Sequence, residues 1–210
     1  MVKIDKIEDG LPISVIIPLS EKRENFFYDY VYPLIEINNP NEIIINTYKG
    51  TAPRKRNIGF NKSTQPYIFF CDDDILLPND YLLKLYNTLI KSINVGYVYT
   101  GYKGIVLHPE SHPMKGNFEI KSNEFNIDLL KRGNYISTMS LMKREVFPRF
   151  DENLRRFQDW DLYLTMLSNG VEGKFVKDLQ FMAYYIDSGI TTNDNDIVDA
   201  FRIIKHKHNL

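Results

Sequence analysis

Three adjacent carboxylates, Asp72, Asp73 and Asp74, directly follow an apolar run at residues 67–71. Because like charges this close repel one another, a positive group has to compensate them. Hard cations such as Mg²⁺ take oxygen ligands and commonly bind between one or two carboxylates and the phosphates of a substrate. A solvated acidic loop is the alternative, but the position after an apolar strand favours a divalent metal held by Asp72 and Asp74.

Two further carboxylates, Asp159 and Asp161, open a predicted helix. At about 100° per residue, Asp159 falls in line with Leu162 and Met166 on the apolar side, whereas Asp161 falls in line with Thr165 on a polar stripe. A carboxylate at a helix start but on its apolar side is either an N-cap or a group aimed into a cleft. We therefore predict that Asp159 is the catalytic base and that Asp161 is structural or solvated.

A basic cluster, Arg54, Lys55 and Arg56, lies between two of the predicted strands and precedes Asn57 and Gly59. Arginine binds phosphate oxygens bidentately, so this cluster is suited to face a diphosphate. A solvated basic helix face is the alternative, and the cluster taken alone favours that alternative.

The elements that must position these residues alternate between strands and helices. Short apolar, β-branched runs predict strands buried on both faces of a sheet, and the intervening segments predict helices. This alternation implies right-handed crossovers and a parallel sheet covered by helices, which is an α/β fold. In the first half the predicted strands are residues 13–17, 42–46 and 67–71, and the predicted helices run through 34–36 and over 54–62.

The second half is less regular, and no internal repeat or linker divides the chain. Its predicted elements are a helix at 78–91, a strand at 95–100, a loop or hairpin insertion at 101–120, a strand at 135–142, a helix at 159–168, one or two strands at 175–186 and a final helix at 194–210.

Length and composition exclude several classes of protein. The 210 residues are 43% hydrophobic and 25% charged, which indicates one ordinary globular domain and excludes a disordered chain. A net charge of −1 provides no general attraction to nucleic acid, which argues against a nucleic-acid acceptor without removing it as an alternative. The single Cys71 excludes an internal disulfide and a cysteine-based zinc cluster. The charged N-terminus is not a signal peptide, and no run could span a membrane, so a cytoplasmic protein is expected.

These motifs, in this order, resemble the family 2 glycosyltransferases with the GT-A fold. Residues 13–20 look like the family's opening strand and its nucleotide-contacting loop. Residues 56–59 (Arg-Asn-Ile-Gly), followed by residues 67–74, are similar to the family's Arg-Asn-x-Gly and D-x-D pairing. Residues 134–146 and 158–162 resemble its acceptor-side segment and its Glu-Asp motif. The likeness runs from residue 13 to about residue 191.

The resemblance implies a single GT-A glycosyltransferase domain over residues 1–210. Its α/β fold would be a Rossmann-like, mostly parallel sheet flanked by helices, with an antiparallel region on the acceptor side. The nucleotide-sugar-binding half would cover about residues 11–100, the acceptor-binding half about 101–192, and a C-terminal tail 193–210.

The resemblance also implies a reaction. A sugar would pass from a nucleoside-diphosphate sugar, with UDP-sugar favoured, to a hydroxyl of a glycan, glycolipid or other acceptor, with inversion. Mn²⁺ or Mg²⁺ on Asp72 and Asp74 would stabilise the departing diphosphate, and Asp159 would be the general base. The implied donor-binding residues are Pro18, Leu19, Ser20, Thr47, Tyr48, Arg56, Asp72 and Asp73.

Three departures from the family pattern leave an alternative open. The second strand ends in Asn46-Thr47-Tyr48, where the family usually has adjacent Asp residues, so stacking of Tyr48 on the base is a hypothesis. Gln158 stands where the family has Glu, and residues 186–191 lack a His, which leaves Asp187 as their one candidate side-chain ligand. These differences favour a noncatalytic nucleotide-sugar-binding or scaffold protein on a GT-A frame as the second hypothesis. A nucleotidyltransferase is a third, against which the missing Gly-rich N-terminal loop argues.

Overall fold

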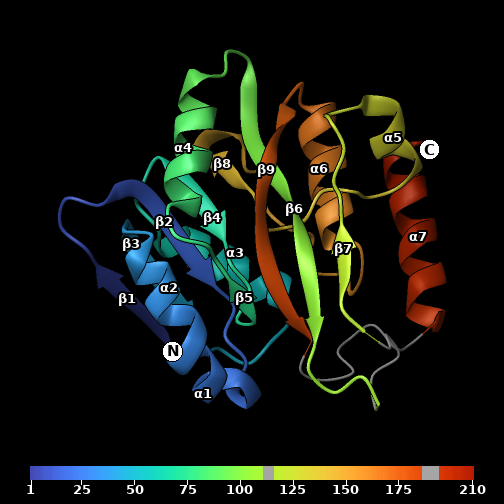
Figure 1. Ribbon diagram of the computed structural model, residues 1–210. Coiled ribbons are helices and arrows are strands. Elements are labelled where there is room, and N and C mark those ends of the chain that lie inside the picture. Colours follow the sequence, from blue (N-terminus) through green and yellow to red (C-terminus); the bar gives the residue numbers. More distant parts are fainter. Residues whose placement is uncertain (111–115, 186–193) are drawn as a thin grey trace.

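A long mixed β-sheet runs through the molecule in the order β1-β3-β2-β4-β8-β6-β9-β5, with β7 paired to β6 (Figure 1). The computed structural model describes residues 1–110, 116–185 and 194–210. The strands are β1 (Val2–Lys6), β2 (Leu11–Ile17), β3 (Pro40–Asn46), β4 (Tyr67–Phe70), β5 (Ile75–Leu76), β6 (Val95–Val106), β7 (Phe118–Ile120), β8 (Leu141–Lys143) and β9 (Glu172–Tyr185).

The central strands β3, β2 and β4 are parallel, as the sequence predicted. Ile16 on β2 lies opposite Ile44 on β3 and Phe70 on β4, and all three side chains are fully buried. A parallel strand that is buried on both faces has a continuous apolar sequence. This is why the predicted ranges of β2, β3 and β4 lie close to the observed ones. Their carboxyl ends meet at one edge of the sheet, so the loops that follow them lie together.

The rest of the sheet contains more antiparallel pairs than the sequence predicted. β8 lies between β4 and β6 and is antiparallel to both, β1 is antiparallel to β3, and β5 is antiparallel to β9. Among the described strands, β6 and β9 form the one further parallel pair. β1 was not predicted, because it is a short edge strand with a half-polar sequence, and edge strands lack the apolar runs of central ones.

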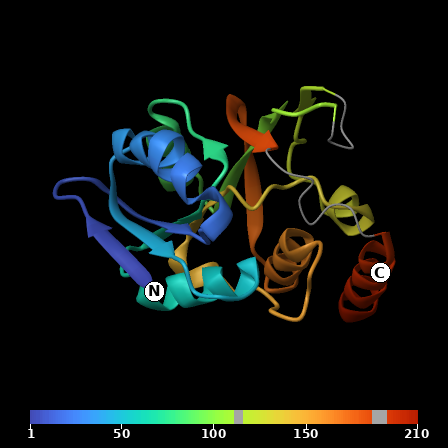
Figure 2. The same cartoon turned by 90° about the horizontal axis from the view of Figure 1, so that it is seen from below.

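Helices cover both faces of this sheet, which confirms the predicted α/β architecture. Figure 2 shows α1 and α2 on one side of the sheet and α3 and α6 on the other, with α7 beside α6. The helices are α1 (Glu24–Phe26), which continues through the π-helical turn η2 (Phe27–Val31) into α2 (Tyr32–Ile37), α3 (Ala52–Lys62), α4 (Tyr81–Lys91), α5 (Ile127–Arg132), α6 (Gln158–Ser168) and α7 (Asp194–His208). Two apolar cores result, one under α2 and α4 and one under α6. No helix among the described residues combines the length and apolar character needed to cross a bilayer.

The predicted strand over residues 135–142 is wrong for most of its length, since only Leu141–Lys143 forms β8. In the preceding segment, side chains replace the strand ladder as partners of the backbone. The Ile136 amide donates to Oδ1 of Asn134, and the Met139 amide donates to Oγ of Ser137, each at 3.1 Å. Such local bonds compete with strand pairing, and they turn this segment toward the start of α6.

The glycine of the Arg-Asn-Ile-Gly motif allows α3 to pack closely on β2. A methyl group on Gly59 would overlap Cγ2 of Ile16, which is fully buried. We expect Gly59→Ala to lower the free energy of unfolding by about 1–3 kcal/mol, because overpacking outweighs the better helix propensity of alanine. Urea denaturation measures this change. The control is Gly133→Ala, since a methyl group there meets no atom within 4 Å; equal stability of the two variants would contradict the prediction.

Candidate active site

The three carboxylates after β4 are compensated by two arginines from different parts of the chain. Nη1 of Arg23 lies 2.6 Å from Asp73 Oδ1 and 2.7 Å from Asp74 Oδ2. Arg56 donates through Nη2 to Oδ1 of Asp72. Arg23 and Arg56 therefore provide part of the positive charge that the three adjacent carboxylates need.

The predicted donor loop, residues 18–20, lies against this cluster. The Ser20 amide donates to Asp73 Oδ2 at 2.7 Å, and Lys55 Nζ donates to the carbonyl oxygen of Leu19 at 2.6 Å. These two hydrogen bonds hold the loop by its backbone, and Pro18 and Leu19 are buried. The ends of β2 and β4 thus bring together Leu19, Ser20 and Asp73, as the parallel register requires.

The cluster contains more carboxyl groups than paired guanidinium groups. Burial, together with the neighbouring Asp72 and Asp73, outweighs the Arg23 guanidinium and raises the pKa of Asp74 to about 7. Burial likewise raises the pKa of Asp73, although Arg23 and the Ser20 amide act in the opposite direction. Three carboxylates against two guanidinium groups leave one unmatched negative charge when all are ionised.

This donor set suits a hard divalent cation. Asp72 and Asp74 supply only oxygen ligands, and the unmatched charge favours an added cation. Within the described residues, no group of three or more His, Cys, Asp or Glu side chains is arranged to hold a metal. A cation here would therefore need ligands from a bound phosphate and water, which is how Mg²⁺ is commonly held. The candidate ligand Asp187 lies outside the described residues.

Arg56 connects the carboxylate cluster to the start of α6. Its side chain is almost fully buried, and its guanidinium lies 5.3 Å from the centre of the Phe150 ring. Nη1 lies 3.4 Å from Oε1 of Gln158, the residue that replaces the expected Glu. A neutral amide accepts this bond without adding a further carboxylate to the site. The alternative of a solvated basic face is wrong for Arg56.

Asp159 lies in the first turn of α6, directly after Gln158. Its Oδ1 accepts from the Trp160 amide at 2.9 Å, and the Asn134 side chain also hydrogen-bonds to it. Burial raises the pKa of this carboxyl above its usual range, while the Trp160 amide, the Arg56 charge and Asn134 partly offset that rise. A carboxyl group with a raised pKa is a better proton acceptor than an ordinary surface aspartate.

Asp161 is buried, so its predicted alternative as a solvated residue is wrong and the structural alternative describes it. It is 2% exposed, and its carboxylate receives Lys207 Nζ at 2.9 Å and His208 Nε2 at 2.8 Å. Lys207 also lies 3.1 Å from Asp151 Oδ2. The periodicity of α6 alone cannot show that α7 covers its polar stripe, which explains the error.

The predicted base-contacting residues lie at the end of β3. Tyr48 is 51% exposed, and its amide donates to Oδ1 of Asn46 at 3.0 Å. The Thr47 hydroxyl donates to the carbonyl oxygen of Met1 at 3.1 Å. Asn46 donates to the carbonyl oxygen of Lys55 at 2.8 Å, which fixes the β3 end beside α3. Among the contacts of the described residues, none joins Thr47 or Tyr48 directly to the carboxylate cluster.

Sequence reasoning missed Arg23 and Asn134 as site residues. A signal for Arg23 was present, because it follows the first predicted strand by a few residues and the adjacent strand ends in three carboxylates. Asn134 carried no comparable signal, since its contact with Asp159 depends on the irregular segment before β8.

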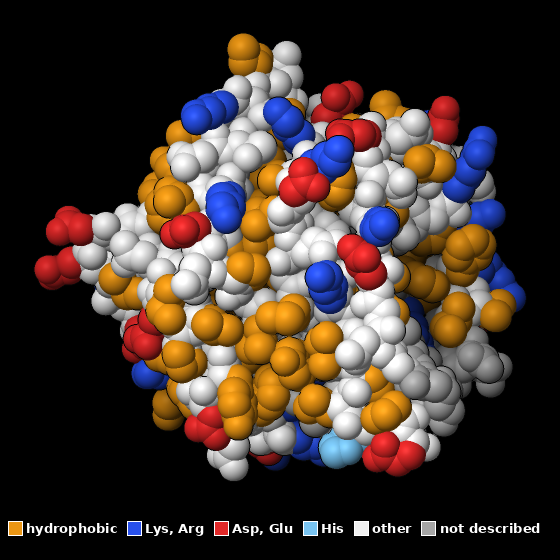
Figure 3. All heavy atoms as spheres, in the orientation of Figure 1, with side chains coloured by type: hydrophobic (Ala, Val, Ile, Leu, Met, Phe, Trp, Pro, Cys, Tyr) orange, Lys and Arg blue, Asp and Glu red, His pale blue; other side chains and the backbone are white. Residues whose placement is uncertain are grey.

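Aromatic rings that are exposed or half-buried lie beside the carboxylate cluster. Phe26 lies 5.1 Å from Tyr30 and 5.7 Å from Tyr184, measured between ring centres, and Tyr30 is 58% exposed. The Tyr184 amide donates to the carbonyl oxygen of Asp74 at 2.9 Å, which ties these rings to the site. Figure 3 shows hydrophobic side chains gathered beside α1 and the lower ends of β5 and β9. The rim of the site therefore carries an apolar surface next to its charges.

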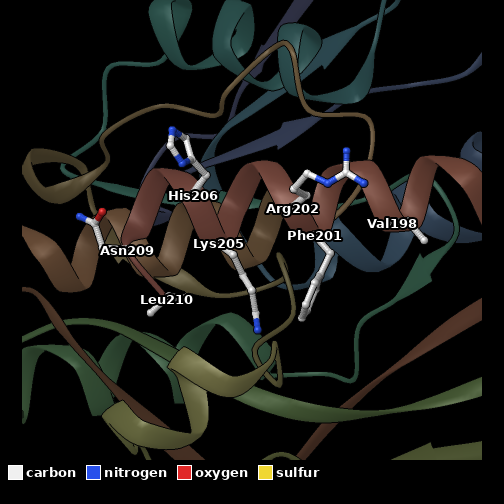
Figure 4. Close-up of a pocket in the computed structure, with 7 residues that line it drawn as sticks. All are labelled: Val198, Phe201, Arg202, Lys205, His206, Asn209 and Leu210. Carbon is white, nitrogen blue, oxygen red and sulfur yellow. The ribbon is translucent and has the colours of Figure 1, made fainter.

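A surface pocket of about 570 Å³ lies elsewhere, along α7. In Figure 4, Phe201 and Lys205 point to the same side of this helix, and Lys205 Nζ lies 4.8 Å from the centre of the Phe201 ring. None of the predicted site residues lines this pocket, so it is separate from the carboxylate cluster. Its lining residues are Val198, Phe201, Arg202, Lys205, His206, Asn209 and Leu210.

This chain superposes on several solved structures. S. aureus TarS 1-349 in complex with UDP-GlcNAc superposes with a TM-score of 0.67 at 15% identity, over 94% of this chain and 66% of that chain. GalNAc-T7 with UDP, GalNAc and Mn²⁺ superposes with a TM-score of 0.62 at 11% identity, over 95% and 48%. The chain thus spans about two thirds of the first structure and about half of the second. At these identities the likeness establishes the GT-A fold alone.

Comparison of the sequence with protein-family models identifies the family of this chain. No curated protein sequence matches this chain significantly. The family model described as "Glycosyl transferase family 2" matches residues 29–150, which is more than half of the chain and includes Arg56 and the three carboxylates after β4. The chain therefore belongs to glycosyl transferase family 2.

Proposed function

We propose that this chain is a glycosyltransferase that moves a sugar from a nucleoside-diphosphate sugar, with UDP-sugar favoured, to an acceptor hydroxyl. One observation carries the proposal: Arg56 joins the carboxylate cluster after β4 to the first turn of α6, where Asp159 lies. A donor-side cluster and a candidate base therefore belong to one site. The complexes of TarS with UDP-GlcNAc and of GalNAc-T7 with UDP support the choice of donor.

The donor would bind at the carboxyl ends of β2, β3 and β4. In this proposal the buried loop 18–20 and Asp73 contact the nucleotide, while Thr47 and Tyr48 approach the base from the end of β3. Asp72, fixed by Arg56, contacts the ribose or the metal. The partly exposed positions of Asp72 and Tyr48 support these roles.

Asp72 and Asp74 would hold Mn²⁺ or Mg²⁺. When bound, such an ion supplies positive charge that stabilises the departing nucleoside diphosphate. The oxygen-only donor set and the unmatched negative charge of the cluster support this assignment, as does the Mn²⁺ in the GalNAc-T7 complex.

Asp159 would act as the general base. It would accept the proton of the acceptor hydroxyl while that oxygen bonds to the anomeric carbon and the bond from this carbon to the diphosphate breaks, the electron pair leaving with the diphosphate. Attack from the side opposite the leaving group inverts the anomeric configuration. The raised pKa of Asp159 and its hydrogen bond with Asn134 support this role.

The acceptor in this proposal is a glycan, a glycolipid or another molecule that carries a hydroxyl group. Residues 11–100 would bind the donor and residues 101–192 the acceptor, within one domain that ends in the tail 193–210. The buried free thiol of Cys71 agrees with a cytoplasmic location, where thiols stay reduced.

The role of Asp159 is tested by Asp159→Asn, which keeps the shape of the side chain and removes its basicity. We expect the turnover of a UDP-sugar to fall by about 10²- to 10⁴-fold, the usual effect of losing a general base, while UDP affinity stays within about twofold. The exposed Asp128→Asn in α5 is the control. Full transfer activity in Asp159→Asn would remove this residue from the mechanism.

The role of Asn134 is tested by the pH dependence of kcat/KM. The Asn134 hydrogen bond lowers the pKa of Asp159, and the base has to be ionised to accept a proton. Asn134→Ala should therefore raise this pKa and move the acid limb of the profile to higher pH. An unchanged limb would show that this hydrogen bond does not tune the base.

Donor binding is tested by the thermal stability of the wild type and Asp74→Ala with nucleoside diphosphates, in Mn²⁺, Mg²⁺ or EDTA. A ligand that binds only the native state adds about 2.7 kcal/mol of apparent stability at a hundredfold excess over Kd. We expect a metal-dependent shift with UDP that is lost in Asp74→Ala. A wild type that responds to no nucleotide would instead support the noncatalytic scaffold alternative.

A further inference from the structure

Arg23 differs from Arg56 in how it meets the carboxylate cluster. The Arg56 side chain is 5% exposed and holds Asp72, whereas the Arg23 side chain is 27% exposed and bridges Asp73 and Asp74. Arg23 is therefore the guanidinium that solvent and ligands can reach.

Asp73 and Asp74 depend on Arg23 to different extents. Asp73 also accepts the Ser20 amide at 2.7 Å, so it keeps a strong partner if Arg23 moves. The Asp74 carboxylate accepts from Arg23 at 2.7 Å and hydrogen-bonds with its own backbone, so Arg23 is its described side-chain partner. Asp74 is also the carboxylate that the proposed function assigns to the metal. The Asp74 carboxylate is thus the partner of the Arg23 guanidinium and also the proposed ligand of the divalent metal ion.

We propose that Arg23 is the resident counter-ion of Asp74 and competes with a divalent cation for this carboxylate, so that the free protein binds the cation weakly and takes it up together with the diphosphate of the donor. This inference rests on the proposed function, because it assumes that the donor diphosphate reaches the cluster.

The charges of the cluster explain the coupling. Counted over the three ionised carboxylates and the two guanidinium groups, a divalent cation would change the charge from −1 to +1, and it would lie next to the Arg23 guanidinium. Two cations at one carboxylate repel each other strongly at a partly buried site. A diphosphate reverses this balance, since its oxygens are ligands for the cation and partners for the released arginine.

The test measures Mn²⁺ binding directly, by electron paramagnetic resonance of free Mn²⁺ titrated with protein. Arg23→Met should bind Mn²⁺ about tenfold or more tightly than the wild type in the absence of nucleotide. The matched control is Lys22→Met, because Lys22 is exposed in the same turn and forms no ion pair within the described part of the chain. Its Mn²⁺ affinity should stay within about twofold of the wild type. Equal or weaker Mn²⁺ binding by Arg23→Met would overturn the proposal.

The coupling is tested by repeating the titration with UDP. UDP should strengthen Mn²⁺ binding by a larger factor in the wild type than in Arg23→Met, because only the wild type has a guanidinium to displace. Equal factors would overturn the coupling.

A second variant guards against loss of folding in Arg23→Met. Arg23→Lys keeps the charge but lacks the fork that bridges two carboxylates. It should fold and show an intermediate Mn²⁺ affinity, and an affinity equal to that of the wild type would count against competition at Asp74. Failure of the proposed function looks different, since the wild type would then bind no UDP with any metal.

Discussion

The buried guanidinium of Arg56 is the contact on which the site depends. It reaches Asp72 after β4, and it reaches the Phe150 ring and Gln158, which lie just before and at the start of α6, far from Asp72 in the sequence. A buried charge without a partner is strongly destabilising, so burial of Arg56 requires Asp72 to stay in place beside it. The close approach of α3 to β2 at Gly59 makes this reach possible, because it sets α3 directly against the carboxyl ends of the parallel strands.

The neighbouring Asn57 extends the same connection. It exchanges two hydrogen bonds with the backbone of Phe150, at 2.9 and 3.0 Å, and donates to Glu152 at 3.0 Å. The motif residues Arg56 and Asn57 thus fasten the first half of the chain to the segment before α6. Further along, Asp161 receives Lys207 and His208, so the last helix holds the helix that carries Asp159. The geometry of the candidate base is therefore set from both ends of the chain.

The two arginines that pair with the carboxylate cluster differ in their exposure to solvent. Arg56 is enclosed and serves the fold and the site together, while Arg23 lies where a ligand can meet it. The three carboxylates outnumber the two guanidinium groups, and burial raises the pKa of Asp74 to about 7. The carboxylates attract a metal ion, but the Arg23 guanidinium already neutralises part of their charge. The affinity of the site for a metal ion should therefore depend on whether a diphosphate is also bound. Both arginines come from loops or helices that follow neighbouring parallel strands, as the topology of an open α/β sheet demands.

The sequence by itself determined the central parallel strands, the carboxylate run that ends β4 and the position of Asp159 at the start of α6. These are local features, because an apolar run, a cluster of charges or the start of a helix can be recognised from a few consecutive residues. The tertiary structure alone decided that β8 is antiparallel between β4 and β6, that Arg23 is the partner of Asp73 and Asp74, and that α7 buries Asp161. Each of these depends on segments about 50 to 75 residues apart, or on a helix face that another helix covers. Periodicity within one element carries no information about its partners, since burial and charge pairing are properties of the assembled fold.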